Sequence, residues 1–181
     1  QGVLHGDNTD GAGLVRDIVQ NLGISLAGKR ILLLGAGGAA RGVVLPLAQQ
    51  APAQMVLWNR TLSKAQAIVD ALPLLPNVRV WQPQDADTGF DVVINATSAS
   101  LHGAALEIPP AVFLHAELAY DMMYGAQPTA FMRIAQQAGA ACVADGLGML
   151  VEQAAEAFFV WRGVMPQTAP VLQAVRAGLV A

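Results

Sequence analysis

Short apolar runs alternate with amphipathic segments along most of this 181-residue chain, and this alternation limits the fold more than any other feature. The apolar runs have the length and composition of buried β-strands, and helical patterns follow several of them. We predict strands at residues 30–34, 54–58, 78–81, 91–95, 117–120 and 141–144. We predict the helices between them at residues 39–50, 62–72 and 129–138. Because strands joined by helices form parallel sheets, the sequence predicts an α/β fold with a mainly parallel six-stranded sheet flanked by helices.

A glycine-rich turn follows the first predicted strand directly. Its residues are Gly35, Ala36, Gly37, Gly38, Ala39 and Ala40. In dinucleotide-binding turns one glycine allows the sharp bend and a second lets the backbone approach the pyrophosphate, and Gly35 and Gly37 fit these roles. The amides from Gly38 to Ala40 open the next helix, whose positive end then faces the phosphates. An ordinary strand-to-helix turn is the alternative, but the flanking strand and helix favour a Rossmann-like, doubly wound nucleotide-binding domain.

The end of the second predicted strand discriminates between NAD and NADP. An NAD site usually has an acidic residue here, which holds the ribose hydroxyls. This chain instead has Asn59, Arg60 and Thr61, with Lys64 one helical turn later. Arg60 and Lys64 can clamp a phosphate, and Thr61 can either bind that phosphate or cap the helix. The alternative is a solvated helix start, which leaves two cations at the positive end of the helix dipole unexplained. The pattern therefore predicts NADP(H) as cofactor.

Further helical segments flank this unit on both sides. Before it, one apolar stripe consists of Leu14, Val15, Ile18, Val19 and Leu22. Gly23 follows this stripe and is the expected C-terminal cap. After the unit, a second stripe consists of Leu147, Leu150, Val151, Ala154, Phe158 and Trp161. We expect both stripes to pack against the core, and we expect a last helix at about residues 169–177.

Composition and charge exclude several classes of protein. The net charge is −3 and the ten Lys and Arg residues are scattered, so we expect no nucleic-acid partner. The single cysteine, Cys142, precludes an internal disulfide and fits a cytoplasmic location. An uncharged run at residues 42–59 is interrupted by proline and glutamine, so we expect no membrane span, and no signal peptide is visible. We also predict no metal site.

Motifs of small and polar residues recur along the whole chain. They are Asn8-Thr9-Asp10-Gly11, the glycine turn at 35–40, the segment 59–64, Asn95-Ala96-Thr97-Ser98, the segment 120–124, and the segment 145–150 followed by Gln153. In this order and spacing the motifs resemble those of the shikimate dehydrogenase family, and the resemblance covers essentially the whole chain.

The resemblance implies a reaction and a role for each motif. The reaction is the reversible, NADPH-dependent reduction of 3-dehydroshikimate to shikimate, in which the cofactor carries the hydride. Asp10 matches the aspartate that, with a lysine, handles the hydroxyl proton. The implied substrate-binding residues are Asn8, Thr9, Asp10, Tyr124 and Gln153. Besides the glycine turn, the implied cofactor-binding residues are Asn59, Arg60, Thr61, Lys64, Thr97, Ser98, Met122, Gly146 and Met149.

Plainer interpretations stay open for the substrate positions when the residues are taken alone. Asp10 fits a helix N-cap, Tyr124 a tyrosine in or at the rim of the core, and Gln153 a surface glutamine. Gly146, Met149 and Gln153 are spaced three and four apart, so they share one helix face. That face differs from the apolar stripe, which suits the wall of a cleft.

The resemblance also implies a preceding substrate-binding domain that carries the catalytic lysine, and neither Lys29 nor Lys64 matches that lysine. We therefore expect a fragment in three parts. Residues 1–24 are a linker helix and the remnant of the substrate domain, 25–145 the NADP-binding Rossmann domain, and 146–181 the C-terminal helices packing back toward the substrate domain.

We expect this fragment to bind NADP(H) without turnover of the small-molecule substrate, and to self-associate, as in a homodimer, through exposed cleft residues. Two alternatives are a quinate/shikimate dehydrogenase and a non-catalytic NADP-binding module.

Overall fold

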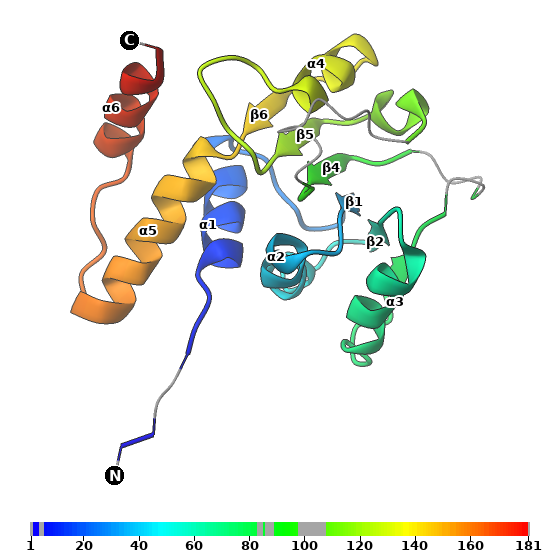
Figure 1. Ribbon diagram of the computed structural model, residues 1–181, viewed down its shortest axis with the longest axis horizontal. Coiled ribbons are helices and arrows are strands. Elements are labelled where there is room, and N and C mark those ends of the chain that lie inside the picture. Colours follow the sequence, from blue (N-terminus) through cyan, green and yellow to red (C-terminus); the bar gives the residue numbers. More distant parts are fainter. Residues whose placement is uncertain (1, 4–5, 83–84, 86–88, 98–107, 181) are drawn as a thin grey trace.

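A single six-stranded parallel sheet forms the centre of the protein, as Figure 1 shows for the computed structural model. The structure describes residues 2–3, 6–82, 85, 89–97 and 108–180. The strands are β1 (Arg30–Leu34), β2 (Gln54–Trp58), β3 (Val78–Val80), β4 (Val92–Asn95), β5 (Leu118–Asp121) and β6 (Val143–Asp145). Their order in the sheet is β3-β2-β1-β4-β5-β6, and every neighbouring pair is parallel. This is the order of a doubly wound dinucleotide-binding fold, so the predicted fold class is confirmed.

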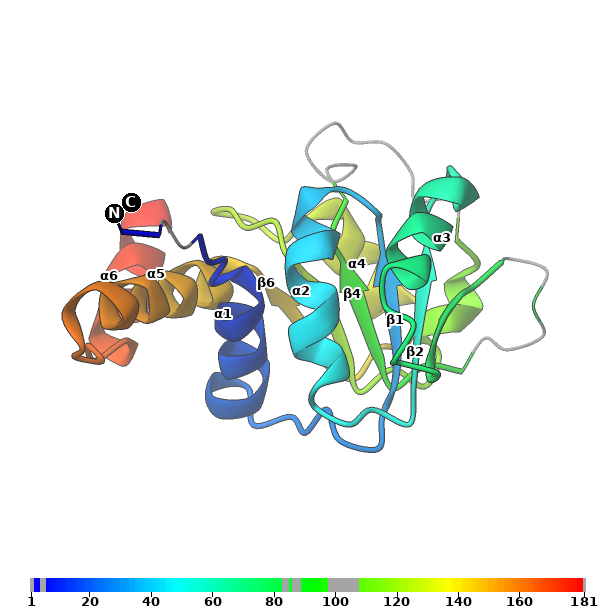
Figure 2. The ribbon, with the colours of Figure 1, turned by 90° about the horizontal axis from the view of Figure 1, so that it is seen from below.

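Helices cover both faces of this sheet. The helices are α1 (Asp10–Arg16), α2 (Gly38–Ala48), α3 (Leu62–Asp70), α4 (Ala130–Gln137), α5 (Leu147–Arg162) and α6 (Ala169–Val180), with a π-helix η1 (Asp17–Asn21) and a 3-10 helix η3 (Pro110–Phe113). Figures 1 and 2 show α2 and α4 on opposite sides of the strands. Alternate residues of β1 enter opposite cores: Ile31 and Leu33 pack on the α1–α2–α3 side, and Leu32 and Leu34 on the η3–α4 side. Burial on both faces explains why β1 is a continuous apolar run.

The segment before β1 differs from the single regular helix that its stripe suggested. Helix α1 passes without a break into the π-helix η1, and Gly23 follows with a left-handed φ of 70°, as expected of a C-terminal cap. A π-turn inserts an extra residue, which rotates the positions after it around the helix. Leu14 and Ile18 accordingly stay fully buried, whereas Val19 is 39% exposed.

The predicted apolar stripe of α5 is wrong in its second half. Leu147 and Val151 are buried, but Ala154 is exposed, and Phe158 and Trp161 are 44% and 78% exposed. The buried face of the helix is instead formed by Leu147, Gly148, Met149, Val151, Glu152 and Ala155. The buried face differs because the linker segment packs on α5 through glycines. Gly13 and Gly148 lack side chains, so the two helices approach each other closely at these positions.

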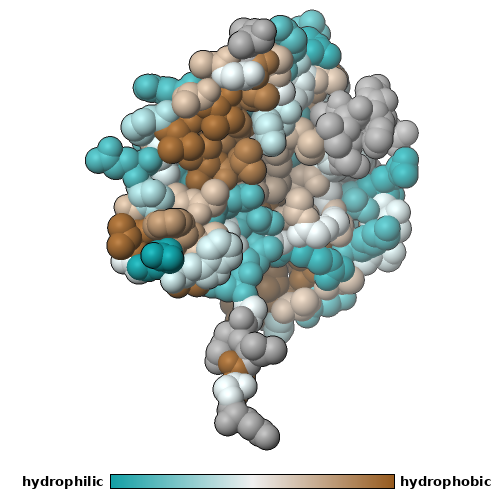
Figure 3. Space-filling view, turned by 60° about the vertical axis from the view of Figure 1, so that its left-hand side comes forward, coloured by the Kyte–Doolittle hydropathy of each residue, from teal (hydrophilic) through white to brown (hydrophobic). Residues whose placement is uncertain are grey.

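The outer ends of α5 and α6 carry exposed apolar side chains. Figure 2 shows these two helices at the end of the molecule beyond α1, away from the sheet. The exposed side chains are Phe158, Phe159, Val160, Trp161, Val164, Met165, Val171 and Val175. Figure 3 views this side of the molecule and shows apolar surface on it. In the described part of the chain, no helix combines the length and apolarity that crossing a bilayer requires.

Candidate functional site

The turn after β1 has the geometry that its glycines predicted. Gly35 has a φ of 111°, in the left-handed region that favours glycine, and its amide donates to the carbonyl of Trp58 at 2.7 Å. A Cβ at this position would lie 3.0 Å from the carbonyl oxygen of Ala96 and 3.1 Å from Cγ2 of Thr97. The turn therefore touches both neighbouring strand ends, β2 on one side and β4 on the other.

Helix α2 begins directly after this turn and presents an open amino terminus. Gly37 is the N-cap residue of α2. Its backbone is extended, and as a glycine it has no side chain that could cap the helix. Gly37, Gly38 and Ala39 are exposed, whereas Ala36 and Ala40 are buried. The small side chain of Ala40, at 0% exposure, lets the helix pack closely against the sheet. Exposed amides at the positive end of a helix make an anion-binding surface.

The residues after β2 form a second part of the same edge. The side-chain amide of Asn59 donates to the carbonyl of Thr61 at 2.9 Å, which fixes the bend between β2 and α3. Thr61 is the N-cap residue of α3, but its side chain makes no capping hydrogen bond. Arg60 and Lys64 are exposed, and neither forms an ion pair with any residue that the structure describes. Two cations and a hydroxyl are thus available to an anion here.

The ends of β4 and β5 lie side by side and are joined by buried polar groups. Asn95 pairs with Asp121 in the sheet register, and both are fully buried. The side-chain amide of Asn95 donates to Oδ1 of Asp121 at 2.9 Å, and Thr97 follows two residues after the end of β4. Met122, half-buried, donates its amide to the carbonyl of Asn95 at 2.9 Å. Ser98, also predicted to bind the cofactor, lies outside the described residues.

The start of α5 completes the edge. Gly146 donates its amide to the carbonyl of Met123 at 3.0 Å, and a Cβ at Gly146 would overlap the carbonyl of Met122. Gly146 is the N-cap of α5, and Met149 in the first turn is 6% exposed and packs in the core. The turns that carry Gly35, Thr97, Met122 and Gly146 are therefore in contact from one strand end to the next.

The polar residues at the start of α1 lie against α2. Asn8 accepts a hydrogen bond from the amide of Asp10 at 2.8 Å through Oδ1, and its own amide donates to Oδ2 of Asp10 at 3.4 Å. Thr9 is the N-cap residue, so the interpretation of Asp10 as the N-cap is wrong by one position. A Cβ on Gly42 would lie 3.3 Å from the Asn8 amide and from Oδ2 of Asp10. The half-buried carboxylate of Asp10 is thus held beside the helix that follows the glycine turn.

Neither Gln153 nor Tyr124 is buried in the core. Gln153 is half-buried, and a Cβ on Gly13 of α1 would lie 2.6 Å from both its Cβ and its backbone nitrogen. Gln153 therefore belongs to the contact between α1 and α5. Tyr124 is 40% exposed in the segment after β5, which contradicts a core position.

A buried polar cluster between α1, η1, β5 and α5 was missed by the sequence analysis. The Tyr120 hydroxyl donates to Oδ2 of Asp17 at 2.6 Å and accepts from the Met149 amide at 3.3 Å. Asn21 donates to Asp17 at 2.8 Å and to Glu152 at 3.1 Å, and Arg16 forms an ion pair with Glu152 at 3.8 Å. The signal that could have revealed this cluster is a charged residue, Asp17, within the apolar stripe of the linker helix.

Burial shifts the ionisation of this cluster. It raises the pKa of Asp17 above the usual 3.8, although the hydrogen bonds from Tyr120 and Asn21 act in the opposite direction. Burial also raises the pKa of the Tyr120 hydroxyl, and the neighbouring Asp17 carboxylate raises it further. Tyr120 is thus a neutral donor to Asp17, and the pair ties the linker helix to the sheet.

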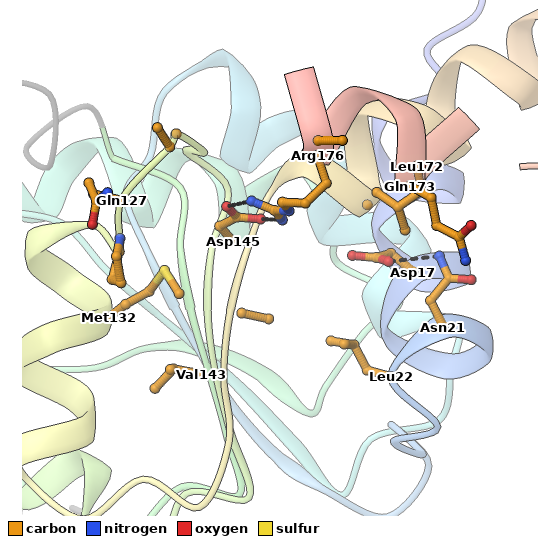
Figure 4. A pocket seen from close by; sticks show the side chains of 16 residues that line it. Asp17, Asn21, Leu22, Gln127, Met132, Val143, Asp145, Leu172, Gln173 and Arg176 are labelled. Carbon is orange, nitrogen blue, oxygen red and sulfur yellow. Dashed lines mark hydrogen bonds and ion pairs between the residues drawn. The ribbon is translucent and has the colours of Figure 1, made fainter. Parts of the chain in front are cut away.

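A cavity of about 750 Å³ lies beside this cluster, between β6, η1 and α6. Figure 4 shows Arg176 from α6 reaching Asp145 in a two-pronged ion pair, with N–O distances of 2.7 and 2.5 Å. Figure 4 also shows Asn21 donating to Asp17 on the opposite wall. None of the predicted cofactor or substrate residues lines this cavity.

Comparisons with known proteins give the family. The sequence profile of Shikimate / quinate 5-dehydrogenase matches residues 14–104, and that of the Shikimate 5'-dehydrogenase C-terminal domain matches residues 146–176. The chain is 60% identical over 179 residues to "Shikimate dehydrogenase (NADP(+))" of Dechloromonas aromatica, covering 98% of this chain and 65% of that relative.

Solved structures also resemble this chain. An Ael1 enzyme from Pseudomonas putida is 48% identical with a TM-score of 0.88, covering 92% of this chain and 62% of that one. A shikimate dehydrogenase crystallised in complex with NADP+ is 29% identical with a TM-score of 0.77, covering 97% of this chain and 63% of that one. The chain thus spans less than two thirds of the length of these relatives. The profile matches and the near-complete alignment of this chain show that it belongs to the shikimate/quinate 5-dehydrogenase family.

Proposed function

We propose that this chain is the cofactor-binding part of an NADP-dependent shikimate dehydrogenase, which reversibly reduces 3-dehydroshikimate to shikimate with NADPH. The observation that supports the proposal best is the order of turns along the carboxyl edge of the sheet. The turn after β1 lies between the cations that follow β2 and the turns that follow β4, β5 and β6. An extended dinucleotide fits this order from end to end, across the point where the strand order reverses.

At the adenosine end, the residues fit a ribose that carries an extra phosphate. Arg60 and Lys64 are exposed cations without an ion pair among the described residues, and the Thr61 hydroxyl caps no backbone amide. Asn59 holds the bend that brings these side chains to the strand end. The exposed amides of the glycine turn and of the first turn of α2 fit the pyrophosphate.

At the other end, the bound cofactor supplies the hydride, and the chain supplies position. Thr97, Met122 and Gly146 line the adjoining strand ends, with Met149 behind them and Ser98 next in sequence to Thr97. Small and apolar groups at this place would help to exclude water from the nicotinamide ring of a bound cofactor.

For the substrate we assign residues on α1, on α5 and after β5. Asp10 exchanges the proton of the reacting hydroxyl together with a lysine from a substrate-binding domain. Asn8, hydrogen-bonded to Asp10, fixes its carboxylate, and Thr9, Tyr124 and Gln153 contact the substrate. Residues 1–24 then form the linker to that domain, 25–145 the cofactor domain, and 146–181 the helices that pack back toward the substrate domain.

A titration of the purified chain by calorimetry tests this proposal. We expect NADP+ to bind at least about tenfold more tightly than NAD+, because two cations meet the 2′-phosphate. We expect 2′,5′-ADP, which carries that phosphate but no nicotinamide, to bind as well. Equal affinities for NADP+ and NAD+ would argue against the phosphate clamp, and a chain that binds neither dinucleotide has another function.

A second candidate substrate is quinate, because the matching family profile covers both shikimate and quinate enzymes. An assay of the complete protein with each substrate, against each cofactor, separates these activities. The composition supports a cytoplasmic protein, and the exposed apolar ends of α5 and α6 support self-association of the isolated chain, as in a homodimer.

A further inference from the structure

Two fully buried polar side chains end adjacent strands at the centre of the proposed cofactor site. Asn95 closes β4 and Asp121 closes β5, and they are register partners in the sheet. Both have 0% exposure, and the Asn95 amide donates to Oδ1 of Asp121 at 2.9 Å. A buried polar pair is no more stabilising than apolar side chains of the same size would be. The pair instead orients its surroundings, because the side-chain oxygens of Asn95 and Asp121 accept hydrogen bonds from particular groups in the turns that follow.

Asn95 fixes the turn after β4. Its Oδ1 accepts from the backbone amide of Thr97 at 3.1 Å and from the Thr97 hydroxyl at 2.7 Å. Both donors of Thr97 are therefore directed back toward the strand end. This arrangement sets where the backbone of residues 96 and 97 runs, and that backbone abuts Gly35 in the turn after β1.

Asp121 fixes the turn after β5 in the same way. Its Oδ1 also accepts from the amide of Met123 at 3.1 Å, and its Oδ2 accepts from the Thr129 hydroxyl at 2.6 Å. Thr129 is the N-cap of α4 and accepts from the Met132 amide at 3.2 Å. Residues 122 and 123 are thus held between the strand end and the start of α4, and Gly146 of α5 rests on Met122 and Met123.

We propose that the hydrogen-bonded Asn95–Asp121 pair is a positioning unit that holds the turns bearing Thr97 and Met122 in register around the nicotinamide ring. The inference rests on the proposed function, because it names what fixes one end of that site. Neither residue needs to touch the cofactor. The adenosine end, held by Arg60 and Lys64 after β2, is on the other side of β1 and does not depend on the pair.

This separation of the two ends gives a test that a merely structural role would not pass. Asn95→Ala and Asp121→Ala are titrated, in the same 181-residue chain, with NADP+, NADPH and 2′,5′-ADP. We expect the affinity for NADP+ to fall about tenfold, as for the loss of one or two buried hydrogen bonds. We expect the affinity for 2′,5′-ADP to change by less than about twofold. The change in NADPH fluorescence at saturation, which reports the surroundings of the nicotinamide, should shrink in both variants.

Two further variants separate position from stability. Asp121→Asn keeps an oxygen acceptor toward Asn95 and Met123, and should restore most of the NADP+ affinity lost in Asp121→Ala. Asp91→Ala removes a carboxylate that bridges β4 to the Arg30 amide of β1 at 2.7 Å, but at the amino edge of the sheet. It should lower the melting temperature without changing the ratio of the two affinities.

Equal losses of NADP+ and 2′,5′-ADP affinity in the alanine variants would overturn the proposal, and so would unchanged NADP+ affinity and fluorescence. Binding of 2′,5′-ADP reports that a variant is folded. If Asp121→Ala does not fold, the comparison of Asn95→Ala with Asp121→Asn decides. A wild-type chain that binds no 2′,5′-ADP would instead refute the proposed NADP function, so the two failures are distinguishable.

Discussion

At the scale of single residues, we propose that cofactor choice depends on two side chains after β2. Arg60 and Lys64 stand where an NAD site would have an acid, and both are exposed. Arg60→Ala should weaken NADP+ binding about tenfold or more, because a charge-assisted hydrogen bond to phosphate is lost, while NAD+ affinity changes little. Calorimetric titration with both dinucleotides measures the difference. Arg162→Ala, at the far end of α5, is the matched control and should alter neither affinity. Equal losses of NADP+ and NAD+ affinity in Arg60→Ala would show that Arg60 does not bind the 2′-phosphate.

A second residue-scale prediction concerns the pH dependence of stability. Because burial raises the folded-state pKa of Asp17 above 3.8, its contribution to stability is fully present below that value and is lost as pH rises through the raised pKa. The stability of the wild type relative to Asp17→Asn should therefore be greatest in acid and should decrease as pH rises. The total decrease is about 1.4 kcal/mol for each unit by which the pKa is raised.

Urea unfolding of both proteins across a series of pH values measures this difference. The neighbouring acids Glu152 and Asp145 and the cations Arg16 and Arg176 are common to both proteins, so their own titration largely cancels. A difference that grows toward neutral pH would mean that the hydrogen bonds from Tyr120 and Asn21 outweigh burial.

At the scale of secondary-structure elements, the α1–α5 contact depends on glycine. A Cβ on Gly148 would lie 2.0 Å from Oδ1 of Asp17, so Gly148→Ala must displace either the hydrogen-bonded Asp17 carboxylate or helix α5 itself. We expect a loss of about 1–3 kcal/mol in the free energy of unfolding, as for overpacking of a tight interface. Gly178→Ala, in α6, has nothing within 4 Å of the added Cβ and should be neutral or slightly stabilising. The denaturation midpoints of the two variants check this. Equal midpoints would mean that the contact at Gly148 accommodates the added methyl group without loss of stability.

The same scale shows why some elements could be predicted and others could not. Strand β1 and the turn at Gly35 follow from local patterns, namely an apolar run and glycines where the backbone must bend. The strand ends were less accurate: the last strand was predicted at 141–144 and lies at Val143–Asp145. The π-helix η1 and the buried face of α5 depend on how two helices meet, and helical spacing within either segment carries no information about its partner.

Much of the candidate site was predictable for a different reason. The residues after β1, β2, β4 and β5 converge because carboxyl ends of parallel strands meet at one edge, so the strand assignment alone brings them together. The Asn95–Asp121 pair illustrates the limit. Both residues belong to motifs that were singled out, but their mutual hydrogen bond depends on β4 and β5 being neighbours in matching register, which no local pattern specifies.

At the scale of the whole molecule, cofactor binding and catalysis should separate in this chain. Lys29 forms an ion pair with Glu117 at 2.5 Å beyond the amino ends of β1 and β5, and Lys64 lies in the first turn of α3. Neither lysine is placed to share a proton with Asp10, which starts α1. Since a positioned acid or base contributes about 10²–10⁴-fold, we expect the purified chain to bind NADPH and yet to show no oxidation of shikimate by NADP+ above background. Absorbance of NADPH measures turnover, and its fluorescence measures binding on the same sample. Shikimate-dependent formation of NADPH by this chain alone would contradict the prediction, because all groups needed for proton transfer would then lie within these 181 residues.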